Sequence, residues 1–368
     1  MTGLEINQLT QVINARGVFT PIGVSRSSVS VATATGEALS RYFIMDELQA
    51  LVGQRISELT GAQAVTLTHC CAASITLAVA GAMAGNVPEK IAALPDTSGM
   101  KSRVVIPRGH AVNYGQPIEQ AIRLAGAHPV LVGTPYQCLI DALVKEIDHD
   151  QTCAVLLVSS RLTIGVTPDF STVIEAAHRA GVPVIIDGAA QDMRIAQLLA
   201  TDADAVLVSA QKYLAGPTAG MVIGKRALID AVRAQEKGIG RAMKASKEAL
   251  VGTLAALFER SQTDMAGWQK EQARKLAGFI AQVNDLSFAE VSAQGDQTGL
   301  PFSRVHLKID ERESKLTALE LASALRSGDP SIWVMDQKAA EGELAFELVQ
   351  VSDAECDSII ARLHVLLD

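Results

Sequence analysis

The sequence predicts an α/β fold in which a mostly parallel central sheet is flanked by helices, together with a smaller α+β domain. From about residue 60, short β-branched runs alternate with helical stretches. These runs are apolar throughout, so both faces of each strand are expected to be buried, as in a parallel sheet covered by helices. After about residue 245 the pattern changes to a long helical stretch followed by several strands. That change predicts the second domain.

The strands of the central sheet are predicted from six runs, at residues 103–107, 128–133, 153–160, 182–188, 204–210 and 219–224. Helices are predicted between most of them, at residues 118–127, 170–181 and 193–202. Gly126 and Gly181 fall where two of these helices should end, a position that favours glycine. The loop between the last two strands is too short for a helical crossover, so this pair is expected to be antiparallel.

The smaller domain is predicted to combine both ends of the chain. One long helix over 246–283 leads into four strands and a final helix, at residues 288–293, 303–309, 331–336, 344–351 and 353–367. We expect a large domain over residues 46–250 and a smaller α+β domain from residues 1–45 and 251–368. The sequence contains no internal repeat.

Charge and cysteine content narrow the function classes. The chain has 40 acidic and 32 basic residues and a net charge of -8, which makes nucleic acid a poor partner. No apolar run reaches the ~20 residues of a membrane-spanning helix, so no membrane partner is expected. The five cysteines are an odd number without regular spacing, which argues against a disulfide framework, and they lack a Cys-x-x-Cys pair, which argues against a structural zinc site. We therefore expect a cytoplasmic protein without a metal.

A lysine and an aspartate are predicted at neighbouring strand ends. Asp187 follows the run 184–186, and Lys212 follows the next strand along the chain. Ligands bind beyond the carboxyl ends of parallel strands. A lysine and a carboxylate there suit pyridoxal 5'-phosphate: the amine forms an imine with the aldehyde, and the carboxylate keeps the ring nitrogen protonated. Taken singly, Lys212 would be a solvated lysine and Asp187 a helix cap.

Other residues are predicted to hold the same cofactor. His110, which alone would be an ordinary hydrogen-bonded loop residue, could stack on the ring. The ring hydroxyl is within the expected reach of Gln191 or Ser160. An apolar helix that begins near Cys71 and Ala72 offers free N–H groups to the phosphate, although alone it would be read as core. Hydroxyl groups could be added by Ser209 and Thr218, the latter across a dimer interface.

A basic cluster is predicted near residue 244. Arg241, Lys244 and Lys247 are spaced three apart, so we expect them near one face of a helix. The functional interpretation is a site for a phosphate or carboxylate tail of the substrate. A solvated basic face is the alternative.

Five stretches resemble fold-type-I pyridoxal phosphate enzymes of the selenocysteine synthase-like group, which includes an ammonia-lyase of an amino-sugar acid. They are residues 13–23, 59–81, 185–191, 209–220 and 238–252. The resemblance implies a transferase-like fold, Lys212 as the Schiff-base lysine, Asp187 as the pyridinium partner and His110 as the stacking residue. It also implies at least a homodimer in which residues 216–218 reach the neighbour's phosphate. Selenocysteine synthase carries a further tRNA-binding region, which we do not expect in this acidic chain.

One position departs from the group. The stretch 325–336 resembles a family stretch that supplies an arginine where Met335 stands. Since an arginine could clamp a substrate carboxylate and a methionine cannot, we expect Arg16 or Arg304 to take that role.

The predicted function is a lyase that removes ammonia from a hydroxylated amino acid or amino-sugar acid, phosphorylated or not, and leaves a 2-keto acid. Aldol cleavage or racemisation of a β-hydroxy amino acid would use the same residues. A catalytically silent protein that keeps the fold is the alternative from another class.

Overall fold

The computed structural model describes residues 5, 8–166, 168–286 and 288–367, so the remaining residues of the predicted domains lie outside the described chain. Two compact units can be recognised: residues 27–262, and residues 1–26 with 263–368. The division differs from the predicted boundaries at 45 and 250. Helix α1 (Val29–Leu39) packs along α10 (Lys247–Gln262), so both helices belong to the larger unit.

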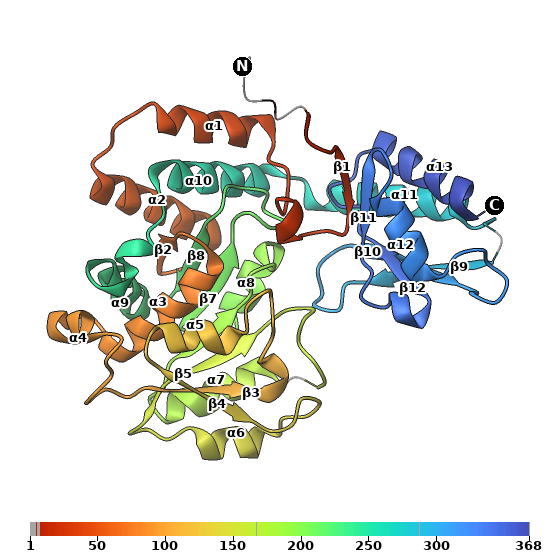
Figure 1. The fold of residues 1–368 in the computed structure, drawn as a ribbon. Coiled ribbons are helices and arrows are strands. Elements are labelled where there is room, and N and C mark those ends of the chain that lie inside the picture. The colour runs from red at the N-terminus through yellow and green to blue at the C-terminus, as the bar shows by residue number, and fades with distance from the viewer. Residues whose placement is uncertain (1–4, 6–7, 167, 287, 368) are drawn as a thin grey trace. The chain divides into compact units, whose positions relative to one another are not determined.

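The larger unit is built on a seven-stranded sheet (Figure 1) of order β2-β8-β7-β6-β5-β3-β4. The strands are β2 (Ala64–Thr68), β3 (Arg103–Pro107), β4 (His128–Val132), β5 (Thr152–Val158), β6 (Val184–Asp187), β7 (Ala205–Ser209) and β8 (Gly220–Gly224). Strands β4, β3, β5, β6 and β7 run parallel, whereas β8 is antiparallel to both β7 and β2. The predicted α/β fold and the antiparallel last pair are confirmed, and β2 is an additional strand.

Hydrophobic side chains of the strands pack on both faces of the sheet. In β5, Val155 and Leu157 join one cluster, while Leu156 and Val158 join the cluster on the other face. All seven residues of this strand are buried. This is the physical reason for the continuous apolar runs in the sequence.

The helices of the larger unit cover these faces. Besides α1 and α10 they are α2 (Met45–Thr60), α3 (Cys71–Ala84), α4 (Pro88–Ala93), α5 (Ile118–Leu124), α6 (Ile140–Glu146), α7 (Phe170–Arg179), α8 (Ile195–Leu199) and α9 (Arg226–Ala234). Gly126 and Gly181 follow α5 and α7 with φ of 88° and 67°, so both end their helices in the left-handed conformation as predicted.

The smaller unit contains two short sheets. An antiparallel sheet has the order β12-β10-β9, from β9 (Ala289–Gly295), β10 (Ser303–Ile309) and β12 (Glu343–Phe346). A parallel pair joins β1 (Val12–Ala15) to β11 (Ser331–Val334). Three helices accompany them: α11 (Met265–Val283), α12 (Ala318–Arg326) and α13 (Asp353–Leu367).

The single long helix predicted over 246–283 is wrong, because the chain breaks between α10 and α11. Asp264 caps the second helix, and its carboxylate accepts a hydrogen bond from the Ala266 N–H at 3.1 Å. Aspartate at this position satisfies a free N–H group of a new helix. The break also coincides with the boundary between the two units.

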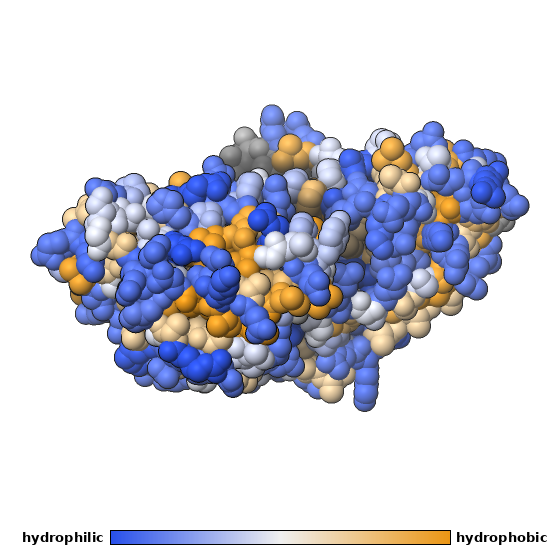
Figure 2. Space-filling model, turned by 90° about the horizontal axis from the view of Figure 1, so that it is seen from below, coloured by the Kyte–Doolittle hydropathy of each residue, from blue (hydrophilic) through white to orange (hydrophobic). Residues whose placement is uncertain are grey.

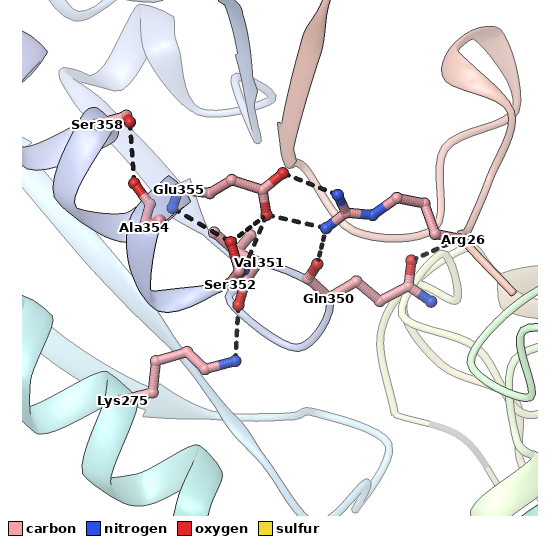
Figure 3. A network of polar contacts seen from close by, with 8 residues as sticks. All are labelled: Arg26, Lys275, Gln350, Val351, Ser352, Ala354, Glu355 and Ser358. Carbon is pink, nitrogen blue, oxygen red and sulfur yellow. Dashed lines mark hydrogen bonds and ion pairs between the residues drawn. The ribbon is translucent and has the colours of Figure 1, made fainter. Parts of the chain in front are cut away.

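Within the smaller unit, Arg26 ties the N-terminal segment to the start of α13 (Figure 3). Its guanidinium donates to both carboxylate oxygens of Glu355, at 2.8 and 2.9 Å, and to the Gln350 carbonyl. Lys275 of α11 donates to the Val351 carbonyl at 2.7 Å. Segments from both ends of the sequence therefore form one folded unit.

Figure 2 shows one face of the molecule, on which patches of hydrophobic surface are bordered by hydrophilic residues. Among the described residues, no helix combines the length and hydrophobicity that a membrane crossing requires.

Candidate active site

Asp187 and Lys212 come together at the carboxyl ends of two adjacent strands. Asp187 is the last residue of β6, and Lys212 lies three residues beyond the end of β7. The strands pair in parallel, with Asp187 opposite Leu207. Asp187 is 5% exposed, and the charge of Lys212 acts to lower its pKa. The amine and the carboxylate therefore lie close enough to interact at neighbouring strand ends, while their shared role in binding a cofactor stays a prediction.

The Asp187 carboxyl group is buried with few partners. Burial raises its pKa above the ordinary value, opposed by Lys212, by the Ala189 N–H and by Cys71. The Ala189 N–H donates at 3.1 Å and the Cys71 thiol at 3.9 Å, both to Oδ1. A carboxylate at this position pays a desolvation cost, which a cationic ring nitrogen beside it would offset.

The start of α3 forms one wall of the same site. Cys70 precedes the helix and gives it no side-chain cap, so the N–H groups of Cys71 and Ala72 remain available to an anion. The Thr68 and Ser74 hydroxyls lie 2.8 Å apart across this turn. A Cβ atom on Gly220 of β8 would lie 2.2 Å from Ser74 Oγ, so only glycine allows the strand to approach so closely.

The Cys71 thiol lies between the other groups of the site. Burial and Asp187 raise its pKa well above the ordinary value, while Lys212 and Ser209 act to lower it. The Ser209 hydroxyl is therefore close to this thiol, but its Oγ makes no hydrogen bond of normal geometry. Cys71, Asp187, Ser209 and Lys212 thus form one cluster. The thiol stays protonated at neutral pH and acts as a weak donor to the carboxylate.

His110 is fixed next to the end of β5. It is 1% exposed, and its Nδ1 accepts a hydrogen bond from the Val158 N–H at 3.0 Å. That bond leaves the ring proton on Nε2, which is buried and has no partner. Burial lowers the pKa of His110 to about 4, so the ring is neutral at pH 7. Its stacking on a cofactor ring stays a prediction.

Tyr114 is a site residue that the sequence reasoning missed. Its pKa is raised by burial and then by electrostatic interaction with Asp187, Cys71 and Cys70, which places the phenol near them. The hydroxyl is buried without a hydrogen-bond partner. Its position four residues after His110 was the only available signal.

These unpaired polar atoms test whether the residues fit the cofactor. Among the described residues, buried atoms without hydrogen bonds near this strand edge include His110 Nε2, Tyr114 Oη and Ser209 Oγ. A buried polar atom without a hydrogen bond lowers the stability of the fold unless a ligand forms that bond. Together with an amine, a buried carboxylate and a helix start, they suit a ring with a cationic nitrogen, a hydroxyl and a phosphate.

Two residues predicted to reach the ring hydroxyl have partners of their own. Gln191 is 1% exposed, and its Oε1 accepts from Arg194 at 3.1 Å. The Ser160 hydroxyl accepts from the Leu162 N–H at 3.2 Å within its own turn. Thr218 is exposed on the lysine loop, as reaching a second chain would require. The roles of all three stay predictions.

The expected helix face of basic residues is wrong. Arg241 lies in a 3-10 helix (Ile239–Ala242), Lys244 lies in an extended connection, and Lys247 begins α10. The chain leaves the helical path because Met243 and Lys244 pair with the end of β2. The Met243 carbonyl accepts from the His69 N–H at 2.7 Å, and Lys244 bridges Thr68. Lys244 is thereby held beside the turn that starts α3.

Lys247 serves a structural role at the start of α10. Its ammonium group donates to the carbonyls of Leu39 and Arg41, at 2.9 and 2.6 Å. These bonds tie the end of α1 to α10 within the larger unit.

The arginines expected to bind a substrate carboxylate are buried in the smaller unit. Arg304 donates to Glu347 and Asp296, each at 2.7 Å. Arg16 donates to the Val334 carbonyl at 2.8 Å and to Asp336. Arg304 is thus already held by two carboxylates, while the buried Nε of Arg16 makes no hydrogen bond. Arg16 is the better of the two for a further anion.

Comparison with known proteins agrees with this arrangement. The model of the Cys/Met metabolism PLP-dependent enzyme family matches residues 129–290. D-glucosaminate-6-phosphate ammonia lyase of Salmonella typhimurium is 34% identical over 98% of this chain and 96% of its own length. The chain belongs to the family of this enzyme. The predicted family, its ammonia-lyase type and the pyridoxal phosphate cofactor are confirmed.

A second relative in the same family is named for another reaction. The 5'-C-glycyluridine monooxygenase-decarboxylase of a Streptomyces species is 31% identical over 97% of this chain and 90% of its own length. A solved structure of D-glucosaminate-6-phosphate ammonia-lyase covers 100% of this chain and 98% of that chain, with a TM-score of 0.89 and 31% identity. Serine palmitoyltransferase with bound PLP shares the fold, with a TM-score of 0.61 and 14% identity.

Proposed function

We propose that this enzyme removes ammonia from a phosphorylated amino-sugar acid of the D-glucosaminate 6-phosphate type. The overall reaction expels the Cβ hydroxyl and the Cα amine, takes back one water and leaves a 2-keto acid. The observation that carries the proposal is that Lys212 lies close enough to buried Asp187 to lower its pKa, in a chain that matches the ammonia lyase over 98% of its length.

The residues that would hold the cofactor follow from the site. Lys212 would supply the amine that binds its aldehyde, and Asp187 would accept from its ring nitrogen. The N–H groups of Cys71 and Ala72, assisted by Ser209, would bind the phosphate. When bound, pyridoxal phosphate supplies an aldehyde that condenses with amines and an electron-poor ring that stabilises negative charge at Cα.

The chain's own groups move the protons. With the substrate amine bound in the site, Lys212 would accept the proton from Cα as the general base. The same amine can then return a proton to the departing hydroxyl. Asp187 would accept from the ring nitrogen, and His110 stays neutral at pH 7 because burial lowers its pKa to about 4.

Two basic residues are proposed to bind the substrate's phosphate. Lys244 is held beside the start of α3 by its pairing with Thr68, and Arg241 is exposed three residues earlier. Two cations near a helix start favour a dianionic group. Arg16 is proposed for the carboxylate, with Arg304 as the weaker alternative.

The deciding experiment is a product analysis. The holoenzyme is incubated with D-glucosaminate 6-phosphate, the unphosphorylated acid and L-serine, and ammonia and 2-keto acid are measured. Equal amounts of both products, formed fastest from the phosphorylated acid and lost in Lys212→Ala, are expected. Oxygen uptake with release of CO2 would instead assign the decarboxylating reaction, and an aldehyde product would assign aldol cleavage. No turnover and no spectral change would favour the binding-protein alternative.

We also propose a cytoplasmic homodimer. Large hydrophobic side chains are exposed along residues 29–51, among them Val29, Leu39, Tyr42, Ile44 and Leu51. A second copy covering this surface would bury them. All five cysteines are free thiols, which suits a reducing compartment. Sedimentation of the protein as a monomer at micromolar concentration would contradict the dimer.

A further inference from the structure

Arg260 of α10 contacts the two segments that carry the site's lysine and aspartate. Its Nη2 donates to the Tyr213 carbonyl at 2.7 Å, and Tyr213 directly follows Lys212. Its Nη1 lies 3.1 Å from Asp192 Oδ2, and Asp192 lies five residues after Asp187. One guanidinium therefore bridges the chain beyond β6 and the chain beyond β7.

The pair is enclosed in the protein. The Asp192 side chain is fully buried and that of Arg260 is 21% exposed. Neither Asp192 oxygen has a hydrogen bond of normal geometry; Arg260 is its ion-pair partner, and the backbone of Asp192 and Met193 also acts to lower its pKa. Removing one member of such a pair leaves an uncompensated buried charge, so the two positions depend strongly on each other.

Helix α10 supports the lysine loop at other points too. A Cβ atom on Gly252 of α10 would lie 2.7 Å from Pro217, and one on Gly216 would lie 3.2 Å from the Ala256 Cβ. The loop itself is closed by the Gly216 N–H donating to the Ala210 carbonyl at 2.8 Å. The helix therefore packs closely against the loop, and Arg260 is the residue of this helix that also contacts the aspartate segment.

We propose that Arg260 is a positioning residue that, through Asp192 and the Tyr213 carbonyl, sets the separation of the Asp187 carboxylate and the Lys212 amine. This inference rests on the proposed attachment of the cofactor at Lys212. It assigns no contact between Arg260 and the cofactor. A shift of either segment by a fraction of an ångström would change how one small ring spans the two groups.

The test uses the holoenzyme of Arg260→Gln, Arg260→Lys and the control Arg103→Gln. Arg103 forms an ion pair of similar length with Glu146, 2.9 Å, at the opposite end of the sheet. The two readouts are the rate of cofactor loss on dialysis and the pH midpoint of the cofactor's visible absorbance. Borohydride reduction followed by peptide mass analysis locates the cofactor in each protein.

In Arg260→Gln we expect cofactor loss to be faster by on the order of tenfold and the midpoint to move by about 0.5 pH unit. Arg260→Lys keeps a positive charge beside Asp192, so its rate of cofactor loss and its pH midpoint should lie between those of Arg260→Gln and the wild type. Arg103→Gln should match the wild type. The inference is overturned if cofactor loss in Arg260→Gln is less than threefold faster than in the wild type, or if the control Arg103→Gln changes equally. If Arg260→Gln does not fold, Arg260→Lys is judged against the same limits. Cofactor found on a residue other than Lys212 in the wild type would defeat the proposed site itself.

Discussion

Two buried polar clusters, one in each unit, differ in how completely their polar atoms are hydrogen-bonded. In the larger unit, Asp187 accepts from one backbone N–H and one weak thiol donor, and neighbouring polar atoms such as Ser209 Oγ have no hydrogen bond of normal geometry. In the smaller unit, Arg304 is held by Asp296 and Glu347, each at 2.7 Å. A cluster that satisfies itself stabilises the fold, whereas a cluster left incomplete is ready for a ligand.

Removing the lysine should have the largest effect on the incomplete cluster. In Lys212→Ala we expect loss of the cofactor's visible absorbance and of turnover by ~10³-fold or more, because we propose that the amine both binds the cofactor and moves the Cα proton. Absorbance and product assays measure this. Lys225→Ala is the matched control, since Lys225 pairs with Asp202 and Asp204 at the opposite end of β7. An unchanged band in Lys212→Ala would refute the assignment.

Breaking the complete cluster should instead cost stability. Arg304→Ala leaves Asp296 and Glu347 buried without their cation, which is expected to lower the free energy of unfolding by about 3–5 kcal/mol. Urea unfolding of the apoprotein measures this. The control Arg274→Ala removes an exposed ion pair of the same unit and should change stability little. A loss in Arg304→Ala no larger than in this control would mean that the cluster is not structural.

The pH dependence of stability should have opposite signs in the two units. Burial raises the pKa of Asp192 to about 6 from 3.8, with Arg260 opposing. Its folded form therefore holds a proton that the unfolded chain has lost, and stability falls as pH rises from about 4 to about 6, by at most ~3 kcal/mol. Asp192→Asn should remove this loss in pH-resolved unfolding of the apoprotein.

Asp296 supplies the contrast. Burial would raise its pKa, but hydrogen bonds from Thr298 and Arg304 and the charge of Arg304 lower it. A lowered pKa contributes stability at neutral pH that is lost as the pH falls through the folded pKa. Asp296→Asn should flatten this acid loss, and an identical pH profile in both variants would contradict the contrast.

The smallest effect is expected at Cys71. Its thiol is a weak donor 3.9 Å from Asp187, so Cys71→Ser should keep the contact and change turnover by less than about threefold, and Cys71→Ala by about tenfold at most. Steady-state kinetics with Cys153→Ser as control measures this, since Cys153 bonds the Arg103 carbonyl away from the site. A larger loss in Cys71→Ser would show that the thiol does more than support the carboxylate.

Local patterns predicted most of the site's framework. The apolar runs predicted the strands, and the short loop before Gly220 predicted the antiparallel pair. The spacing of Asp187 and Lys212 predicted that they follow neighbouring strands. These features depend on near neighbours in the chain or on the rule that parallel strands end at one edge. The break at Asp264 was also visible locally, as a capping residue, but the helical pattern on either side concealed it.

What the sequence alone determined is the chemistry available at one sheet edge: an amine, a carboxylate, an imidazole and a helix start. The tertiary structure decided which of these polar groups would find partners. The same residue type, a buried aspartate, is supported by a thiol at 187, by Arg260 at 192 and by Arg304 at 296. Those partners lie 8 to 116 residues away along the chain. Only packing brings them together, and with them the burial and charge that set each pKa.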